Sequence, residues 1–108
     1  MHVVIFEVWP KADRKGDYLD IAAALKPELE KIDGFISVER FTSLTEEGKM
    51  LSLSFWRDEA AVLRWRAHAE HQAAQGRGRY EIFENYRLRV ATVIRDYGPN
   101  ERAEAPQP

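Results

Sequence analysis

Two histidines and a tryptophan lie close together near residue 68, at a spacing that suits proton transfer next to an apolar surface. His68 and His71 follow Trp65 by three and six residues, and histidine exchanges a proton near neutral pH. At about 100° per residue on a helix, a sheet-facing stripe would hold Ala61, Trp65, Ala69 and Gln72, with His68 and Gln75 along its border. A polar border on a core-facing stripe predicts a cavity with Trp65 as its apolar wall. His68 would handle the proton there, or His71 if the helix bends.

The same residues also have a purely structural interpretation, because a tryptophan on an apolar stripe is most often part of the core and a histidine at its edge is most often solvated. A metal site is not expected. Zinc needs three or four convergent ligands, whereas His68 and His71 are accompanied by a single further histidine, His2, and the chain has no cysteine. The glycines of residues 76–79 lack the phosphate-loop pattern and predict the end of a helix.

Composition narrows the class of protein. The 108 residues suit one domain. The 16 basic and 18 acidic residues are interspersed and leave a net charge of −2, so a nucleic-acid partner is not expected. No apolar run approaches the roughly 18 residues that a membrane span requires, and no signal peptide is recognisable. The absence of cysteine is compatible with a reducing compartment, and we expect a cytoplasmic protein.

The spacing of apolar residues predicts six elements in the order strand, helix, strand, strand, helix, strand. Strands are expected at residues 2–9, 35–41, 49–56 and 86–97, and helices at 17–32 and from 58 to the glycines at 76–79. Asp17 and Asp58 are candidate N-caps. Pro27 predicts a kink in the first helix or the start of a second short one. Residues 1–98 are expected to form the domain and residues 99–108 a disordered tail.

This order predicts an α+β, ferredoxin-like domain: a four-stranded antiparallel sheet that carries both helices on one face. In the first strand Val3 and Ile5 point to one face while Val4, Phe6 and Val8 point to the other, so both faces are apolar. Because the helices cover one face, we expect a second copy of the chain to cover the other. The sequence therefore predicts a homodimer joined through its sheet faces, with a monomer as the alternative.

Three segments, GFISVERFTSL, LSLSFWRDEAAVLRWR and EHQAAQGRGRYEIFENYRLRVATVIRDY, together resemble the antibiotic biosynthesis monooxygenase family over about residues 2–98. The resemblance implies a dimeric α/β barrel. It also implies oxygenation of small electron-rich aromatic compounds, such as quinols and anthrones, by O2 without metal or flavin, so that no cofactor is expected. A deprotonated phenol or enol is itself a reductant. The protein therefore need only bind it in a dry pocket, take its proton and stabilise the anion.

Trp65 matches the helix tryptophan of this family, and the resemblance implies that His71 is the proton acceptor, with His68 as an alternative base. Trp65, Gln75 and Ala61 are the expected substrate-binding residues. Ala61 stands where the antibiotic-tailoring branch has an asparagine, and Gln75 where the haem-degrading branch has a histidine. Haem degradation is therefore not expected. The missing asparagine also favours an alternative, a non-catalytic or stress-associated dimeric module that binds a small hydrophobic ligand.

Overall fold

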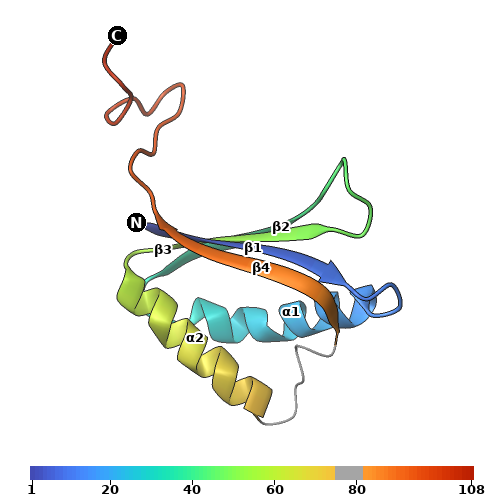
Figure 1. Cartoon of the computed structure of the whole chain (residues 1–108). Helices are drawn as coiled ribbons and strands as arrows, with labels where there is room; N and C mark the ends of the chain where they lie inside the picture. Colours follow the sequence, from blue (N-terminus) through green and yellow to red (C-terminus); the bar gives the residue numbers. More distant parts are fainter. Residues whose placement is uncertain (75–81) are drawn as a thin grey trace.

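The computed structural model describes the backbone of residues 1–74 and 82–108, and the side chains of these residues except 70–74. Its elements are β1 (His2–Pro10), α1 (Lys15–Glu30), β2 (Phe35–Thr42), β3 (Met50–Trp56), α2 (Glu59–Ala74) and β4 (Phe83–Thr92). The strands form one sheet in the order β2-β3-β1-β4, and each neighbouring pair is antiparallel. Both helices lie on one side of this sheet (Figure 1). The predicted ferredoxin-like α+β fold is confirmed.

The last strand begins and ends earlier than its apolar pattern predicts. A register shift near the end of β1 pairs Pro10 with Phe83, which starts β4, and the ladder ends where Thr92 pairs with His2. A bond of 2.9 Å from the Val93 N–H to the Met1 carbonyl closes it. Because β1 begins at His2, residues beyond this point have no strand beside them, and the predicted continuation of the strand to residue 97 is wrong.

The first helix also differs from its prediction. It begins at Lys15 rather than Asp17, and its N-cap residue is Arg14, which makes no side-chain capping bond. Asp17 lies in the first turn and forms an ion pair with Arg14. Pro27 lies inside one continuous helix, so no second helix starts there. Because proline has no N–H, position 27 donates no backbone hydrogen bond to the carbonyl of Ala23, and the helix continues without this bond.

The second helix starts as predicted. The Ala61 N–H donates to the Asp58 carboxylate at 2.9 Å, which is the bond that an N-cap residue makes with the first turn. The predicted end of this helix at residues 76–79 lies outside the described residues.

The two faces of the sheet are divided as the alternation in β1 predicts. Val4, Phe6 and Val8 pack into the core beneath the helices, which consists of two clusters. The buried members of the first are Val8, Tyr18, Met50, Ile82 and Phe83, and those of the second are Leu29, Trp56, Ala61 and Val62. The opposite face carries Val3 and Ile5, each next to an apolar residue of β3. We call this second side, away from the helices, the open face.

Candidate functional site

Three of the predicted site residues lie on one flank of α2. Ala61 is fully buried, and the half-buried Trp65 packs against the cluster that contains Ala61. The ring of His68 lies 5.6 Å from that of Trp65, with an angle of 31° between the ring planes. Since the same cluster includes Leu29 of α1, this flank of α2 is turned toward α1.

His68 has a carboxylate beside it that the sequence analysis did not identify. Its Nε2 atom lies 3.4 Å from Oε1 of Glu28, which is within ion-pair distance. This nitrogen is shielded from solvent and makes no hydrogen bond of good geometry with the described residues. A carboxylate at this distance can orient the imidazole ring. The pair therefore has the composition of a general base with an orienting group.

The remaining predicted site residues fall outside what the structure describes. The backbone of His71 belongs to α2, but its side chain is not among those described, and Gln75 lies beyond the described part of the helix. The roles assigned to His71, His68, Trp65, Gln75 and Ala61 stay predictions.

The helix side of β4 carries an apolar surface that the sequence analysis did not identify as a site. Tyr86, Leu88 and Val90 are exposed at 43%, 51% and 45%. They pair across the ladder with Val8, Phe6 and Val4, whose side chains face the helices. We call these three residues of β4 the β4 apolar row.

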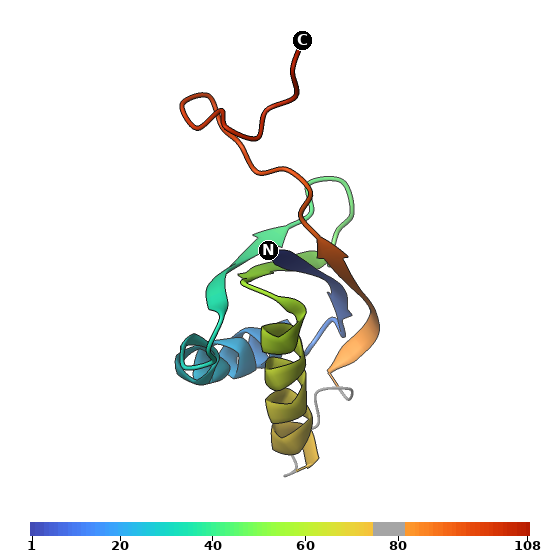
Figure 2. The same cartoon turned by 90° about the vertical axis from the view of Figure 1, so that its left-hand side faces the viewer.

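The β4 apolar row is left exposed by the placement of the helices. Helix α1 lies closest to β2, while α2 lies closest to β1 and β3. In Figure 2, β4 accordingly lies beyond the flank of α2. At one end of the row the ring of Tyr86 lies 5.8 Å from that of Phe6 and 6.1 Å from that of Phe83. Such aromatic and aliphatic groups suit a flat apolar ligand.

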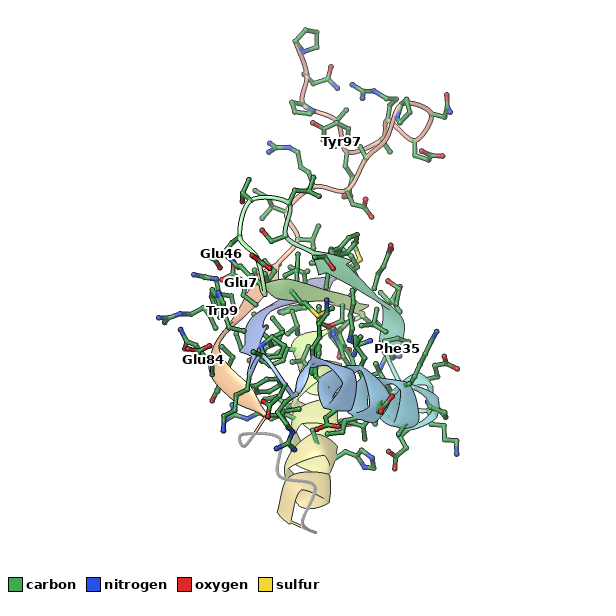
Figure 3. The ribbon with its side chains drawn as sticks, turned by 90° about the vertical axis from the view of Figure 1, so that its right-hand side faces the viewer. Glu7, Trp9, Phe35, Glu46, Glu84 and Tyr97 are labelled. Atoms are coloured by element: carbon green, nitrogen blue, oxygen red, sulfur yellow. The ribbon has the colours of Figure 1, made fainter. Side chains whose placement is uncertain are left out.

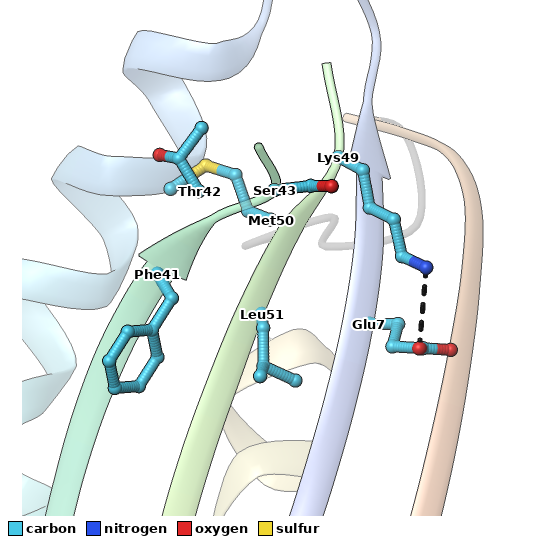
Figure 4. Close-up of a pocket in the computed structure, with 7 residues that line it drawn as sticks. All are labelled: Glu7, Phe41, Thr42, Ser43, Lys49, Met50 and Leu51. Atoms are coloured by element: carbon cyan, nitrogen blue, oxygen red, sulfur yellow. Dashed lines mark ion pairs between the residues drawn. The ribbon is translucent and has the colours of Figure 1, made fainter. Parts of the chain in front are cut away.

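A second candidate surface is a groove on the open face, with a volume of about 230 Å³ (Figure 4). It is lined by Glu7, Phe41, Thr42, Ser43, Lys49, Met50 and Leu51. Oxygens of Glu7 lie 3.3 Å from Lys49 Nζ and 3.0 Å from Arg89 Nη1. The hydrogen bond from Arg89, and after it that from Lys49, holds the pKa of the Glu7 carboxyl below its ordinary value.

The neighbours of this groove are polar as well. The Trp9 indole N–H donates to Glu46, and Lys49 Nζ lies 5.0 Å from the centre of the Trp9 ring. Figure 3 shows Glu7, Trp9 and Glu46 on the same side of the sheet. Because Glu7 is engaged by two cations, it forms a fixed charge rather than a base ready to accept a proton.

Among residues 1–69 and 82–108, whose side chains the structure describes, no three histidine, aspartate or glutamate side chains gather as a metal-binding group. None of the helices described there is long and apolar enough to cross a membrane.

The fold defines the chain as a ferredoxin-like α+β domain, and comparison with known proteins identifies its family. A sequence model of the antibiotic biosynthesis monooxygenase family matches residues 1–77. The jasmonate monooxygenase ABM of Pyricularia oryzae is 48% identical over 101 residues, which are 94% of this chain and 47% of that protein. The chain belongs to the antibiotic biosynthesis monooxygenase family. It spans about half the length of this curated relative.

Solved structures agree on the fold. Rv0793 from Mycobacterium tuberculosis superposes with a TM-score of 0.73 at 17% identity, covering 90% of this chain and 98% of that one. A MhuD variant with two manganese protoporphyrin IX molecules bound per active site has a TM-score of 0.74 at 17% identity, covering 91% and 99%. At these identities the similarity extends to the fold alone.

Proposed function

We propose that this chain is a monooxygenase that oxidises a small electron-rich aromatic compound, of the quinol or anthrone type, with O2 and without metal or flavin. The observation that carries the proposal is the β4 apolar row, which offers Tyr86, Leu88 and Val90 to a flat apolar ligand on the helix side of the sheet. Membership of the family supports it.

The proposed chemistry needs a base and a dry apolar surface. His71, or His68 as the alternative, takes the acidic proton of the substrate and leaves an enolate or phenolate. His68, the alternative, lies 3.4 Å from a carboxylate oxygen of Glu28, on the flank of α2 that faces α1 rather than β4 (Figure 2). Trp65, with Ala61 and Gln75, shapes the apolar surface beside the base.

The electrons for O2 come from the substrate. For an anthrone, the carbanion adds O2 at the reactive carbon to form a peroxide. Cleavage of the O–O bond then leaves one oxygen atom as a ketone on that carbon, and the other departs as water. Two C–H bonds are lost, so the substrate supplies both electron pairs that the O2 molecule accepts, and no further reductant is required.

The test follows O2 consumption by protein that has been freed of metal and flavin. A panel of hydroquinones and anthrones is added, and the product is analysed after reaction under 18O2, which should place one labelled atom in it. His68→Gln and His71→Gln are compared. The variant that lacks the base should lose about 100-fold or more in kcat, with KM changed much less. If the protein causes no O2 uptake above the buffer rate with any compound of the panel, the proposal is wrong.

A second candidate substrate class is favoured by the relative from Pyricularia oryzae, whose name assigns it jasmonate. Jasmonate is a cyclopentanone that carries an alkenyl chain and a carboxylate, and the β4 apolar row suits such a chain. Adding jasmonate to the same O2 assay, with and without a reductant, separates the two classes. If the protein oxygenates jasmonate and is inactive toward every anthrone and quinol, then jasmonate-like compounds are the substrate class and the aromatic class is wrong.

The non-catalytic alternative makes a different prediction. A binding module should lose ligand affinity with Trp65→Ala and keep it with His68→Gln and His71→Gln, whereas an enzyme should lose turnover with the tryptophan and with one of the histidines. Native mass spectrometry of the purified chain reports whether a ligand is retained.

We further propose that the chain forms a homodimer through its open face. Ile5, Leu51 and Leu53 are half-buried in a single chain and lie on neighbouring positions of this face, and a second sheet would remove them from water. In sedimentation at micromolar concentration we expect twice the chain mass of 12.5 kDa. Ile5→Lys should produce the single chain, while Ala23→Lys, on the exposed side of α1, should leave the dimer intact. A 12.5 kDa species for the unmodified chain would refute the dimer.

A further inference from the structure

The segment that follows β4, residues 93–108, leaves the sheet on its open side. Figures 1 and 2 agree that it extends away from the helices, and Figure 3 shows Tyr97 beyond the sheet. The side chains of Ile94 and Tyr97 are exposed at 81% and 45%. Covering apolar groups that are exposed to this degree with a partner surface would lower the free energy of the assembly.

This segment is held together mainly by contacts within itself. The Gly98 N–H donates to the Glu101 carbonyl at 2.9 Å, and the Asp96 N–H donates to a Glu104 carboxylate oxygen at 3.1 Å. The guanidinium of Arg102 lies 5.1 Å from the centre of the Tyr97 ring. Residues 96–104 therefore form a compact turn that presents Tyr97 without support from the sheet.

The position of the segment constrains anything that covers the open face. Two sheets that pack face to face are separated by about 10 Å. A segment as long as residues 93–108 can extend up to about 50 Å, and it rises from the sheet on that same side. A second copy of the chain over the open face must therefore meet this segment.

We propose that residues 93–108 form an arm that packs against the partner copy in the homodimer, with Ile94 and Tyr97 as its apolar contacts. The inference rests on the proposed dimer and adds to it a second contact region outside the sheet. The expectation that residues 99–108 form a disordered tail stays a prediction for the single chain, and the arm predicts that they are held in place in the dimer.

The first experiment measures the dimer dissociation constant of the full chain by sedimentation. Replacing Ile94→Ser and Tyr97→Ser together should raise it at least tenfold. The matched control is Leu63→Ser, an apolar residue of α2 that is exposed at 53% on the helix side, and it should leave the constant unchanged. A dimer whose constant is the same in all three proteins overturns the arm and leaves the dimer standing. A wild-type chain that stays single overturns both.

The second experiment locates the arm directly. Because the chain has no cysteine, Asn100→Cys gives one attachment point for a benzophenone photocrosslinker, and Ala23→Cys on α1 is the control. Isotopically heavy and light chains are mixed, allowed to exchange, irradiated and digested. The arm predicts heavy-to-light crosslinks from position 100 and none from position 23. Crosslinks from position 100 confined to the same chain would mean that the segment covers its own sheet, which contradicts the proposal.

Discussion

Gly34 sets how closely the first turn of α2 approaches the start of β2, and its replacement by alanine has a cost that can be worked out. Its φ of +95° lies in the left-handed region, and an added Cβ would stand 2.7 Å from the Cβ of Ala61. The backbone conformation costs about 1–2 kcal/mol for a residue with a side chain, and the overpacking against Ala61 costs about 1–3 kcal/mol. Gly34→Ala should therefore lower the free energy of unfolding by about 2–5 kcal/mol.

Gly48 provides a matched control for this prediction. Its φ is +82°, but an added Cβ would meet nothing within 4 Å. Gly48→Ala should therefore carry the backbone cost alone, about 1–2 kcal/mol. The difference between the two alanine variants isolates the contact with Ala61.

The assay is urea unfolding followed by circular dichroism, at one fixed protein concentration because self-association would contribute to stability. Combining Gly34→Ala with Ala61→Gly should recover the contact cost, so a double-mutant cycle should give a coupling of about 1–3 kcal/mol. Equal losses for Gly34→Ala and Gly48→Ala, or a coupling near zero, would refute the reasoning.

Two further predictions concern the N-cap and the β4 apolar row. The hydrogen bond from the Ala61 N–H, and after it that from Arg57, holds the pKa of Asp58 below its ordinary value of 3.8. The ionised Asp58 carboxylate therefore stabilises the folded state in full above pH 3.8, and this contribution to the free energy of unfolding disappears as the pH falls through the lowered pKa. Thermal unfolding should show Asp58→Ala less stable than the wild type at pH 7 and indistinguishable from it in strong acid. An undiminished gap in acid would contradict this. Leu88→Asp places a charge at a position whose side chain is 51% exposed. Substrate affinity should therefore fall, while the melting temperature should change little. Unchanged turnover and KM would show that the β4 apolar row does not bind the substrate.

The fold was predictable because its main signals are local. Alternation in β1 and the helical spacing after Asp58 are properties of short segments, and both survive in the structure. The extent of β4 was not predictable in the same way. Val93 and Ile94 continue the apolar, β-branched pattern, but they lie beyond the last pair of the ladder, Thr92 with His2. Strand ends depend on register, which is a property of two segments together.

The candidate site shows the same division between local and distant information. Periodicity placed Trp65 and His68 near one another on α2, and their rings are 5.6 Å apart. It could not supply Glu28, which lies 40 positions before His68 and reaches it because α1 packs against α2. It also could not reveal the β4 apolar row, because alternation shows that Leu88 and Val90 share a face but not that the helices leave this face uncovered.

Glu7 shows the same dependence on partners that are distant in the sequence. In the sequence it is one acidic residue in an apolar strand, which by itself would weaken an interface made from that strand, since an unpaired buried charge is costly. The sheet places Lys49 and Arg89 against it, from positions 42 and 82 residues away. A dimer through the open face would therefore bury a carboxylate that already has two cationic partners, rather than an unpaired charge.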